Sequence, residues 1–143
     1  MRTFISILSR LIWPVLLTVV IFYASERRPT LPEGPLNFIG RDKWIHFFVF
    51  GLLAISFYRV HIIRNRPFIN ALLAISLASL YGLIDEVHQS FTPGRQMDVF
   101  DWIADTAGAI VAVSLYILLP HFRRLLETDL YFSGKKKSAR DNE

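Results

Sequence analysis

The stretch PFINALLAISLASLYGLIDEVHQ, residues 67–89, decides the fold. Residues 67–84 carry no charged side chain, and about 20 apolar residues in a helix span the hydrocarbon core of a bilayer. Pro67 suits the first turn of a helix, where a missing backbone N–H costs nothing. The last five residues, Asp85 to Gln89, contain two acids, a histidine and an amide. The sequence therefore predicts a membrane-spanning helix that ends in a polar turn.

Three more apolar blocks approach the same length. They cover, approximately, residues 4–24, 43–58 and 98–119. Three prolines and two glycines in residues 25–42 exclude a long helix between the first two blocks, and Pro93-Gly94 predicts a turn before the last one. We therefore predict an all-α membrane protein with four transmembrane helices in residues 1–120 and a basic tail at residues 121–143.

The composition fits this class of protein. The chain has 143 residues, of which 52% are hydrophobic, and a mean hydropathy of +0.36. It contains no cysteine, which excludes disulfides, thiolate metal sites and cysteine nucleophiles. The net charge of +4 does not point to nucleic acid, because basic residues of a membrane protein set its orientation and contact lipid headgroups. The expected partner is the lipid bilayer.

The basic residues predict the orientation. With the N-terminus inside, five of the sixteen Lys and Arg residues fall on the outer side, and the other eleven fall on the cytoplasmic side. The five are Arg27, Arg28, Arg41, Lys43 and Arg95. By the positive-inside rule, both termini are cytoplasmic.

Ionisable and amide residues gather at the helix ends that this topology places on the outer side. They are Asp42, Lys43, His46, Asp85, Glu86, His88, Gln89, Arg95, Asp98, Asp101 and Asp105. Ionisable groups at membrane depth are costly, so such a cluster indicates a functional site. At about 100° per residue, the second, third and fourth helices aim many of these side chains into one outward-opening cavity.

Several roles are open to the acids and histidines of this cluster. Glu86 or Asp85 could act as a general base, with His46 or His88 as the acid. Glu86, His46 and His88 could instead share a divalent cation. A solvated helix end without a site is the third interpretation.

The remaining candidates are predicted to bind substrate or to support the site. They are Arg95, Gln89, Asp101, Asp105, Asp42 and Lys43. Arg95 could clamp an anion with two hydrogen bonds, or pair with an acid such as Asp98 or Glu86. Asp42 could cap the start of its helix, as could Asp98. Asp105 lies inside an apolar run and needs a partner, which could be Lys43, Arg95, His46 or a cation.

Small residues recur at intervals of four in the last two blocks. They are Ala74, Ala78 and Gly82 in one block, and Ala104, Gly108 and Ala112 in the other. Small residues let transmembrane helices approach closely, so both stripes predict helix contacts. A stripe left exposed would also allow the bundle to pair with a second copy.

Four short motifs resemble those of the VanZ-like family of small bacterial membrane proteins. They are Asp42-Lys43-Trp44-Ile45-His46-Phe47, Asp85-Glu86-Val87-His88-Gln89-Ser90-Phe91, Pro93-Gly94-Arg95, and Asp98-Val99-x-Asp101 with Ala107-Gly108. The resemblance covers roughly residues 40–115. The family is named for a member associated with low-level resistance to the glycopeptide teicoplanin. The resemblance therefore implies a role in the cell envelope and a multi-pass location in a bacterial cytoplasmic membrane.

Three functions follow as hypotheses. The protein could modify or shield a surface component, such as a lipid-linked cell-wall precursor, and so affect glycopeptide susceptibility. It could be a membrane-embedded hydrolase or transferase that acts on a lipid-linked or phospholipid substrate. It could also be a non-catalytic assembly subunit, in which the polar groups only lock the helices together.

Overall fold

A computed structural model describes residues 2–26, 40–60, 63 and 65–127, with side chains from residue 10 onward. All of the regular secondary structure in these residues is helical. The helices are α1 (Arg2–Ser25), α2 (Arg41–Val60), α3 (Pro67–Ser90), α4 (Val99–Leu118) and α5 (Pro120–Glu127). The predicted all-α class is confirmed.

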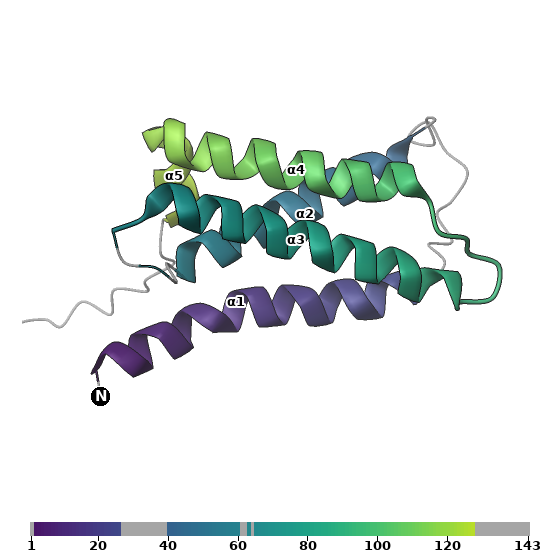
Figure 1. The fold of residues 1–143 in the computed structure, drawn as a ribbon, viewed down its shortest axis with the longest axis horizontal. Coiled ribbons are helices and arrows are strands. Elements are labelled where there is room, and N and C mark those ends of the chain that lie inside the picture. The colour runs from purple at the N-terminus through teal and green to yellow at the C-terminus, as the bar shows by residue number, and fades with distance from the viewer. Residues whose placement is uncertain (1, 27–39, 61–62, 64, 128–143) are drawn as a thin grey trace, which may run out of the picture.

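The helices run alternately up and down along one axis (Figure 1). The helices α2, α3 and α4 pack against one another, and α1 lies along α2 and α3. The start of α1 and the short helix α5 lie at one end of the bundle, while the turn between α3 and α4 lies at the other. The ends of α1 and α3 and the starts of α2 and α4 therefore meet at the same end.

Three of the helices are long and apolar enough to cross a membrane, namely α2, α3 and α4. Within the residues whose side chains are described, Arg10–Ser25 of α1 forms a shorter apolar helix. The chain is a multi-pass membrane protein, and the count of four spans remains a prediction.

Large apolar side chains cover the outside of the bundle. Phe48 on α2 is 62% exposed, and Leu80 on α3 is 55% exposed. A water-soluble protein rarely exposes a contiguous apolar surface of this kind, whereas acyl chains cover it without cost. The outer surface of the bundle is therefore the surface that contacts lipid.

Close packing of α2 against α4 depends on small residues. A Cβ atom added to Gly108 on α4 would collide with the backbone carbonyl of Phe47 on α2. A Cβ atom added to Gly51 on α2 would lie 3.0 Å from the Cβ atom of Ala112. The predicted contact role of Gly108 and Ala112 is confirmed, and Gly51 supplies the matching surface on the facing helix.

The helix α3 packs against its neighbours through small residues and through two polar contacts. Ala74 and Ala78 are buried in the apolar core, as their spacing predicts. Ser79 lies at the interface with α4, where its hydroxyl is 2.7 Å from that of Thr106 and its carbonyl accepts a 3.0 Å hydrogen bond from Trp102 Nε1. Hydrogen bonds between helices add to packing where the surroundings are apolar.

The segment after α4 contains a helix, where the sequence predicts a basic tail. Pro120 begins α5, which ends at Glu127. Phe122 and Leu126 pack against the core of the bundle, while Leu125 stays exposed. Residues 128–143 of the predicted tail lie outside the described part of the chain.

Replacing Gly108 by alanine is expected to destabilise the bundle by about 2–3 kcal/mol, because the new methyl group meets backbone that cannot rotate away. The measurement is the free energy of unfolding of the purified protein in detergent. Ile110→Ala, on the lipid-facing side of the same helix, is the control. Equal losses for both variants would contradict the proposed close contact.

Candidate polar site at the Lys43 end of the bundle

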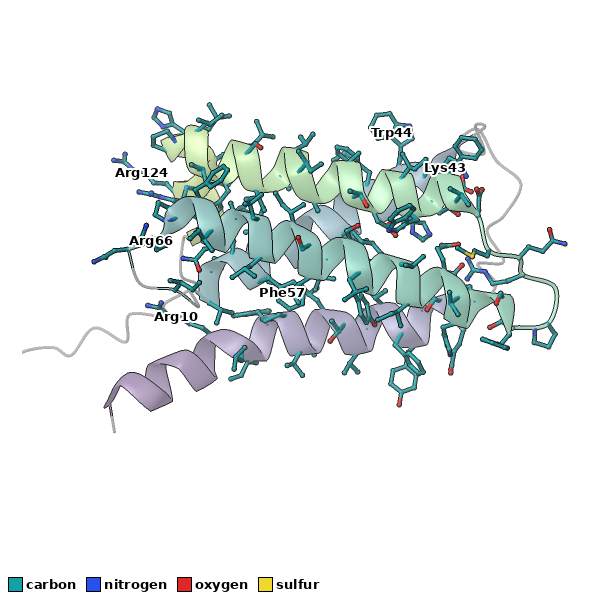
Figure 2. The ribbon with its side chains drawn as sticks, in the orientation of Figure 1. Arg10, Lys43, Trp44, Phe57, Arg66 and Arg124 are labelled. Atoms are coloured by element: carbon teal, nitrogen blue, oxygen red, sulfur yellow. The ribbon has the colours of Figure 1, made fainter. Side chains whose placement is uncertain are left out.

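The two ends of the bundle differ in chemistry. Figure 2 shows Lys43 and Trp44 at one end, and Arg10, Arg66 and Arg124 at the opposite end. The acids and histidines predicted to form a site belong to the Lys43 end, where α2 and α4 begin and α3 ends. The predicted cluster is therefore one region of the fold.

Lys43 joins the starts of α2 and α4. Its Nζ atom lies 2.8 Å from Asp98 Oδ2, 2.8 Å from Asp101 Oδ1 and 3.2 Å from Asp42 Oδ2. Asp101 is buried, whereas Asp42 is exposed. One ammonium group thus faces three carboxylates, and it fixes the position of α2 relative to α4 at this end.

Asp98 caps α4, as the sequence predicts. Its Oδ1 atom accepts a 2.8 Å hydrogen bond from the backbone N–H of Phe100. The hydrogen bond from Lys43, and then the one from Phe100, hold the pKa of the Asp98 carboxyl below its ordinary value of 3.8. Asp98 is therefore ionised at neutral pH.

His46 and Asp105 form a pair inside the bundle. The Nδ1 atom of His46 lies 2.9 Å from Asp105 Oδ1, and the Asp105 side chain has no exposed surface. Gly82 on α3 leaves space for this carboxylate, because a Cβ atom there would lie 2.5 Å from Asp105 Oδ2. Of the partners predicted for Asp105, the structure gives it His46.

Glu86 is buried between α3 and the start of α4. Its Oε2 atom accepts a 2.8 Å hydrogen bond from the backbone N–H of Asp98, one of the N–H groups that precede the helix. Its Oε1 atom is buried and has no hydrogen-bond partner in the described part of the chain, and the same is true of Asp105 Oδ2. Buried carboxylate oxygens without partners are costly, so both require an explanation.

Among the described residues, two sets of side chains are close enough to share a metal ion. His46, Glu86 and Asp101 each offer a ligand atom within 4.8 Å of the other two. Asp42, Asp98 and Asp101 form a second set. The cation site predicted from sequence combined His46 and Glu86 with His88, whereas the structure brings Asp101 to that position.

His88 lies away from the other candidates. Its ring stacks on Phe22 of α1, with 4.4 Å between the ring centres. Glu86 and His88 are two residues apart and so lie about 200° apart around α3, which directs them to different sides of the helix. The structure separates His88 from the His46–Asp105 pair.

Asp85 ties α3 to the end of α1. Its Oδ1 atom lies 2.6 Å from the hydroxyl of Ser25, and its Oδ2 atom accepts a 2.8 Å hydrogen bond from Gln89 Nε2. Arg95 donates a 2.8 Å hydrogen bond from Nη1 to the carbonyl of Ser25. Both oxygens of Asp85 are occupied, which suits a structural role better than that of a general base.

A cavity of about 390 Å³ opens beside these residues, between α1, α2 and α3. Its polar lining consists of Ser25, Asp42, His46, Asp85, Gln89 and Arg95. Its apolar lining consists of Ile21, Ala24, Ile45, Val49 and Phe50. The cavity predicted from the sequence is built by the second, third and fourth helices, whereas the described lining comes from α1, α2, α3 and Arg95 and includes no residue of α4. A serine at the end of an apolar block was the available signal for Ser25.

Nine of the eleven candidates divide into two groups, while His88 stacks on Phe22 and Asp98 caps α4. Five of them line the cavity, namely Asp42, His46, Asp85, Gln89 and Arg95. Lys43, Glu86, Asp101 and Asp105 lie in the carboxylate cluster beside it. His46 belongs to both groups, because it lines the cavity and also contacts Asp105.

Replacing Asp98 by alanine is expected to cost about 1 kcal/mol of stability, because the helix cap and the contact with Lys43 are both lost. Asp98→Asn keeps an oxygen for the cap and is expected to cost less. Since the pKa of Asp98 is lowered by folding, the difference between wild type and Asp98→Asn should be present above pH 3.8 and shrink as the pH falls further. Denaturation in detergent at several pH values measures it, and a difference independent of pH would contradict the ion pair.

Comparisons with known proteins agree with this description. Residues 10–120 match the model of the family described as VanZ/LLP1. The chain is also 37% identical over 115 residues to a protein of Schizosaccharomyces pombe named "Uncharacterized protein C11E3.10". The matched region is 80% of this chain and 66% of the yeast protein, so the chain spans about two thirds of the length of that relative. No solved structure matches.

The yeast relative bears on the location predicted from sequence. A protein similar to this chain occurs outside bacteria, so a bacterial cytoplasmic membrane remains a prediction, whereas helices long and apolar enough to cross a membrane are present in this chain. The match covers α2, α3, α4 and most of α1, and with them the whole polar site. The chain belongs to the VanZ/LLP1 family.

Proposed function

We propose that the protein binds an amphiphilic membrane lipid with an anionic headgroup, either a phospholipid or a lipid-linked precursor, in the cavity between α1, α2 and α3. The observation that supports this proposal is the mixed lining of the cavity, which joins an apolar wall to a polar end. A volume of about 390 Å³ lies within the range of small-molecule sites. The cavity has room for a headgroup and the first part of a chain.

The apolar wall suits the hydrocarbon part of such a molecule. Ile21, Ile45 and Val49 line the cavity from α1 and α2. Because these helices face lipid on their outer sides, a chain can leave the cavity toward the bilayer without crossing water. A soluble polar ligand would leave this wall without a matching surface.

Arg95 is the group that we propose for the anion. Its Nη1 atom is held by the carbonyl of Ser25, which fixes the guanidinium at the edge of the cavity. An arginine has five N–H donors, so most of them stay available for phosphate oxygens. Asp42 also lines the cavity, and it would select a headgroup that carries hydroxyl donors beside its phosphate.

We further propose that this site faces the outside of the cell. The positive-inside rule supports this orientation, and Arg10, Arg66 and Arg124 lie at the end opposite Lys43 (Figure 2). In a bacterial envelope, a site on that face would shield or modify a surface component. This is the route by which we propose that the protein influences susceptibility to teicoplanin.

A second candidate function is hydrolysis or transfer at the headgroup, and the His46–Asp105 pair favours it. A carboxylate that accepts the Nδ1–H proton orients the imidazole and leaves Nε2 free as a proton acceptor. Nε2 would take a proton from water as its oxygen bonds to the headgroup phosphorus. The phosphoester P–O bond would break, and the same proton would pass to the departing alcohol.

Filling the cavity should remove the bound lipid. Val49→Trp is expected to abolish binding of a fluorescent anionic phospholipid, because the indole would occupy the apolar wall. The measurement is fluorescence titration of the purified protein in detergent. Phe48→Trp, which adds the same group on the exposed side of α2, is the control and should bind as wild type does. Unchanged binding by Val49→Trp would refute the proposed cavity site.

The role of Arg95 is tested by headgroup charge. Arg95→Gln is expected to weaken binding of an anionic phospholipid about 10-fold or more, because a charge-assisted hydrogen bond contributes about 1.5–3 kcal/mol. Binding of a zwitterionic lipid should change much less. Equal losses for both headgroups would show that Arg95 supports the structure and does not select the anion.

Release of a lipid alcohol by wild type but not by His46→Gln would favour the catalytic candidate over binding alone.

The orientation is open to a separate test. A reporter fused after Glu127 should read as cytoplasmic, because the charge count places the end of α5 inside. A reporter fused after Gly94, in the turn between α3 and α4, should read as external. The reverse pattern would place the polar site on the cytoplasmic side and would remove the proposed envelope role.

A further inference from the structure

We infer that His46, Glu86 and Asp101 form a binding site for one divalent transition-metal ion, of the Zn²⁺ or Mn²⁺ kind. The three side chains come from α2, α3 and α4 respectively, so one ion would connect all three spans. This inference goes beyond lipid binding, and it holds whether or not a lipid occupies the cavity.

The first argument is the distance between the ligand atoms. One ring nitrogen and two carboxylate oxygens lie within 4.8 Å of one another. Ligand atoms bound to Zn²⁺ at about 2.0–2.2 Å in a tetrahedral arrangement lie roughly 3.3 Å apart. Small side-chain rotations therefore suffice to close the site, and the backbones of the three helices need not move.

The second argument is the unpartnered oxygen of Glu86. The Glu86 side chain is buried, with only 1% of the residue exposed, and its Oε1 atom has no hydrogen-bond partner within the described residues. A buried carboxylate oxygen without a hydrogen-bond partner is costly inside a membrane-spanning bundle. A cation bound at Oε1 would satisfy it, while Oε2 remains bonded to the N–H of Asp98.

The third argument is the way in which Asp105 holds His46. Asp105 occupies Nδ1 of the imidazole, which leaves Nε2 as the nitrogen for a metal. A metal bound at Nε2 would replace the role of this nitrogen as a proton acceptor in the catalytic candidate. Histidine ligands commonly donate their other N–H to a carboxylate, which fixes the tautomer and the ring orientation. Asp105 is fully buried and lies outside the ligand set, so it is a positioning residue here and not a ligand.

The balance of charge among the carboxylates around Lys43 and His46 also favours a bound cation. Lys43 faces Asp42, Asp98 and Asp101, and His46 faces Asp105, while Glu86 accepts only a backbone N–H among the described contacts. The carboxylates of this cluster thus exceed its basic groups. A divalent cation would reduce that excess of negative charge inside the bundle.

The other acidic set, Asp42, Asp98 and Asp101, is a weaker candidate. The Nζ atom of Lys43 lies within 3.2 Å of all three carboxylates, so an ammonium group already neutralises this set. A cation bound there would share all three carboxylates with Lys43, whereas the set that contains His46 shares only Asp101 with Lys43. The ligand type also separates the two sets, because an imidazole with carboxylates suits Zn²⁺ or Mn²⁺, whereas carboxylates alone suit Mg²⁺ or Ca²⁺.

The site is tested on the full-length protein, purified in detergent after treatment with a chelator. The protein is loaded with Zn²⁺ or with Mn²⁺ and dialysed, and the bound metal is measured by mass spectrometry. We expect one ion per chain for wild type, and background levels for His46→Ala and Glu86→Gln. His88→Ala is the matched control, because that histidine stacks on Phe22 and should leave the metal content unchanged.

A positioning role for Asp105 has its own readout. Asp105→Asn should weaken metal affinity about 10–100-fold without removing the site, as loss of such a carboxylate does elsewhere. It should also shift the visible absorption of protein loaded with Co²⁺, because the ring orientation changes. Loss of stability with an unchanged Co²⁺ spectrum and unchanged affinity would show that Asp105 has a structural role alone.

Two results would overturn the inference. The first is absence of stoichiometric Zn²⁺ and Mn²⁺ in wild type, and the second is full retention of metal by His46→Ala. If Glu86→Gln fails to accumulate in the membrane, these two measurements still decide. Metal binding is measured without added lipid, and lipid binding is measured in chelator, so failure of either proposal leaves the other standing.

Discussion

The buried carboxylate of Asp105 constrains the rest of the structure. A charge at this depth of a membrane-spanning helix needs a partner, and it obtains one only where α2 brings His46 to 2.9 Å. The same carboxylate needs space, which the missing side chain of Gly82 on α3 provides. One residue on α4 thus fixes how both other helices are rotated about their axes.

Two further features stabilise this arrangement of α2 and α4, namely the packing of small residues and the contacts of Lys43. Gly108 lets the backbones of α2 and α4 approach within the span, which apolar side chains alone cannot achieve because lipid solvates them equally well. At the end of the same pair of helices, Lys43 holds Asp98 and Asp101. The close contact at Gly108 and the ion pairs of Lys43 require the same alignment of α2 with α4. The polar site and the helix packing therefore depend on each other.

Much of this could be predicted from the sequence, because a bilayer imposes a simple rule on helix length. The apolar blocks predicted the positions of α2, α3 and α4, and the interval of four predicted the buried faces around Ala78 and Gly108. The direction of each side chain was harder to predict, because successive residues of a helix point about 100° apart. Glu86 therefore faces His46 and Asp101, whereas His88 faces Phe22. Contacts made by α1 depend on tertiary structure, so the serine at the end of the first apolar block did not by itself indicate Asp85 as its partner. The helix α5 did carry a local signal, because Pro120 suits a first turn as well as it suits a helix end.

His46 couples ligand binding in the cavity to the charge of the neighbouring carboxylate cluster. Its ring lines the cavity, while Nδ1 holds the Asp105 carboxylate. An anionic headgroup placed in the cavity would add negative charge beside a cluster already rich in carboxylates, which Arg95 alone offsets only in part. A cation held by His46, Glu86 and Asp101 would remove that repulsion and strengthen headgroup binding. By linkage, the lipid would then strengthen metal binding by the same factor.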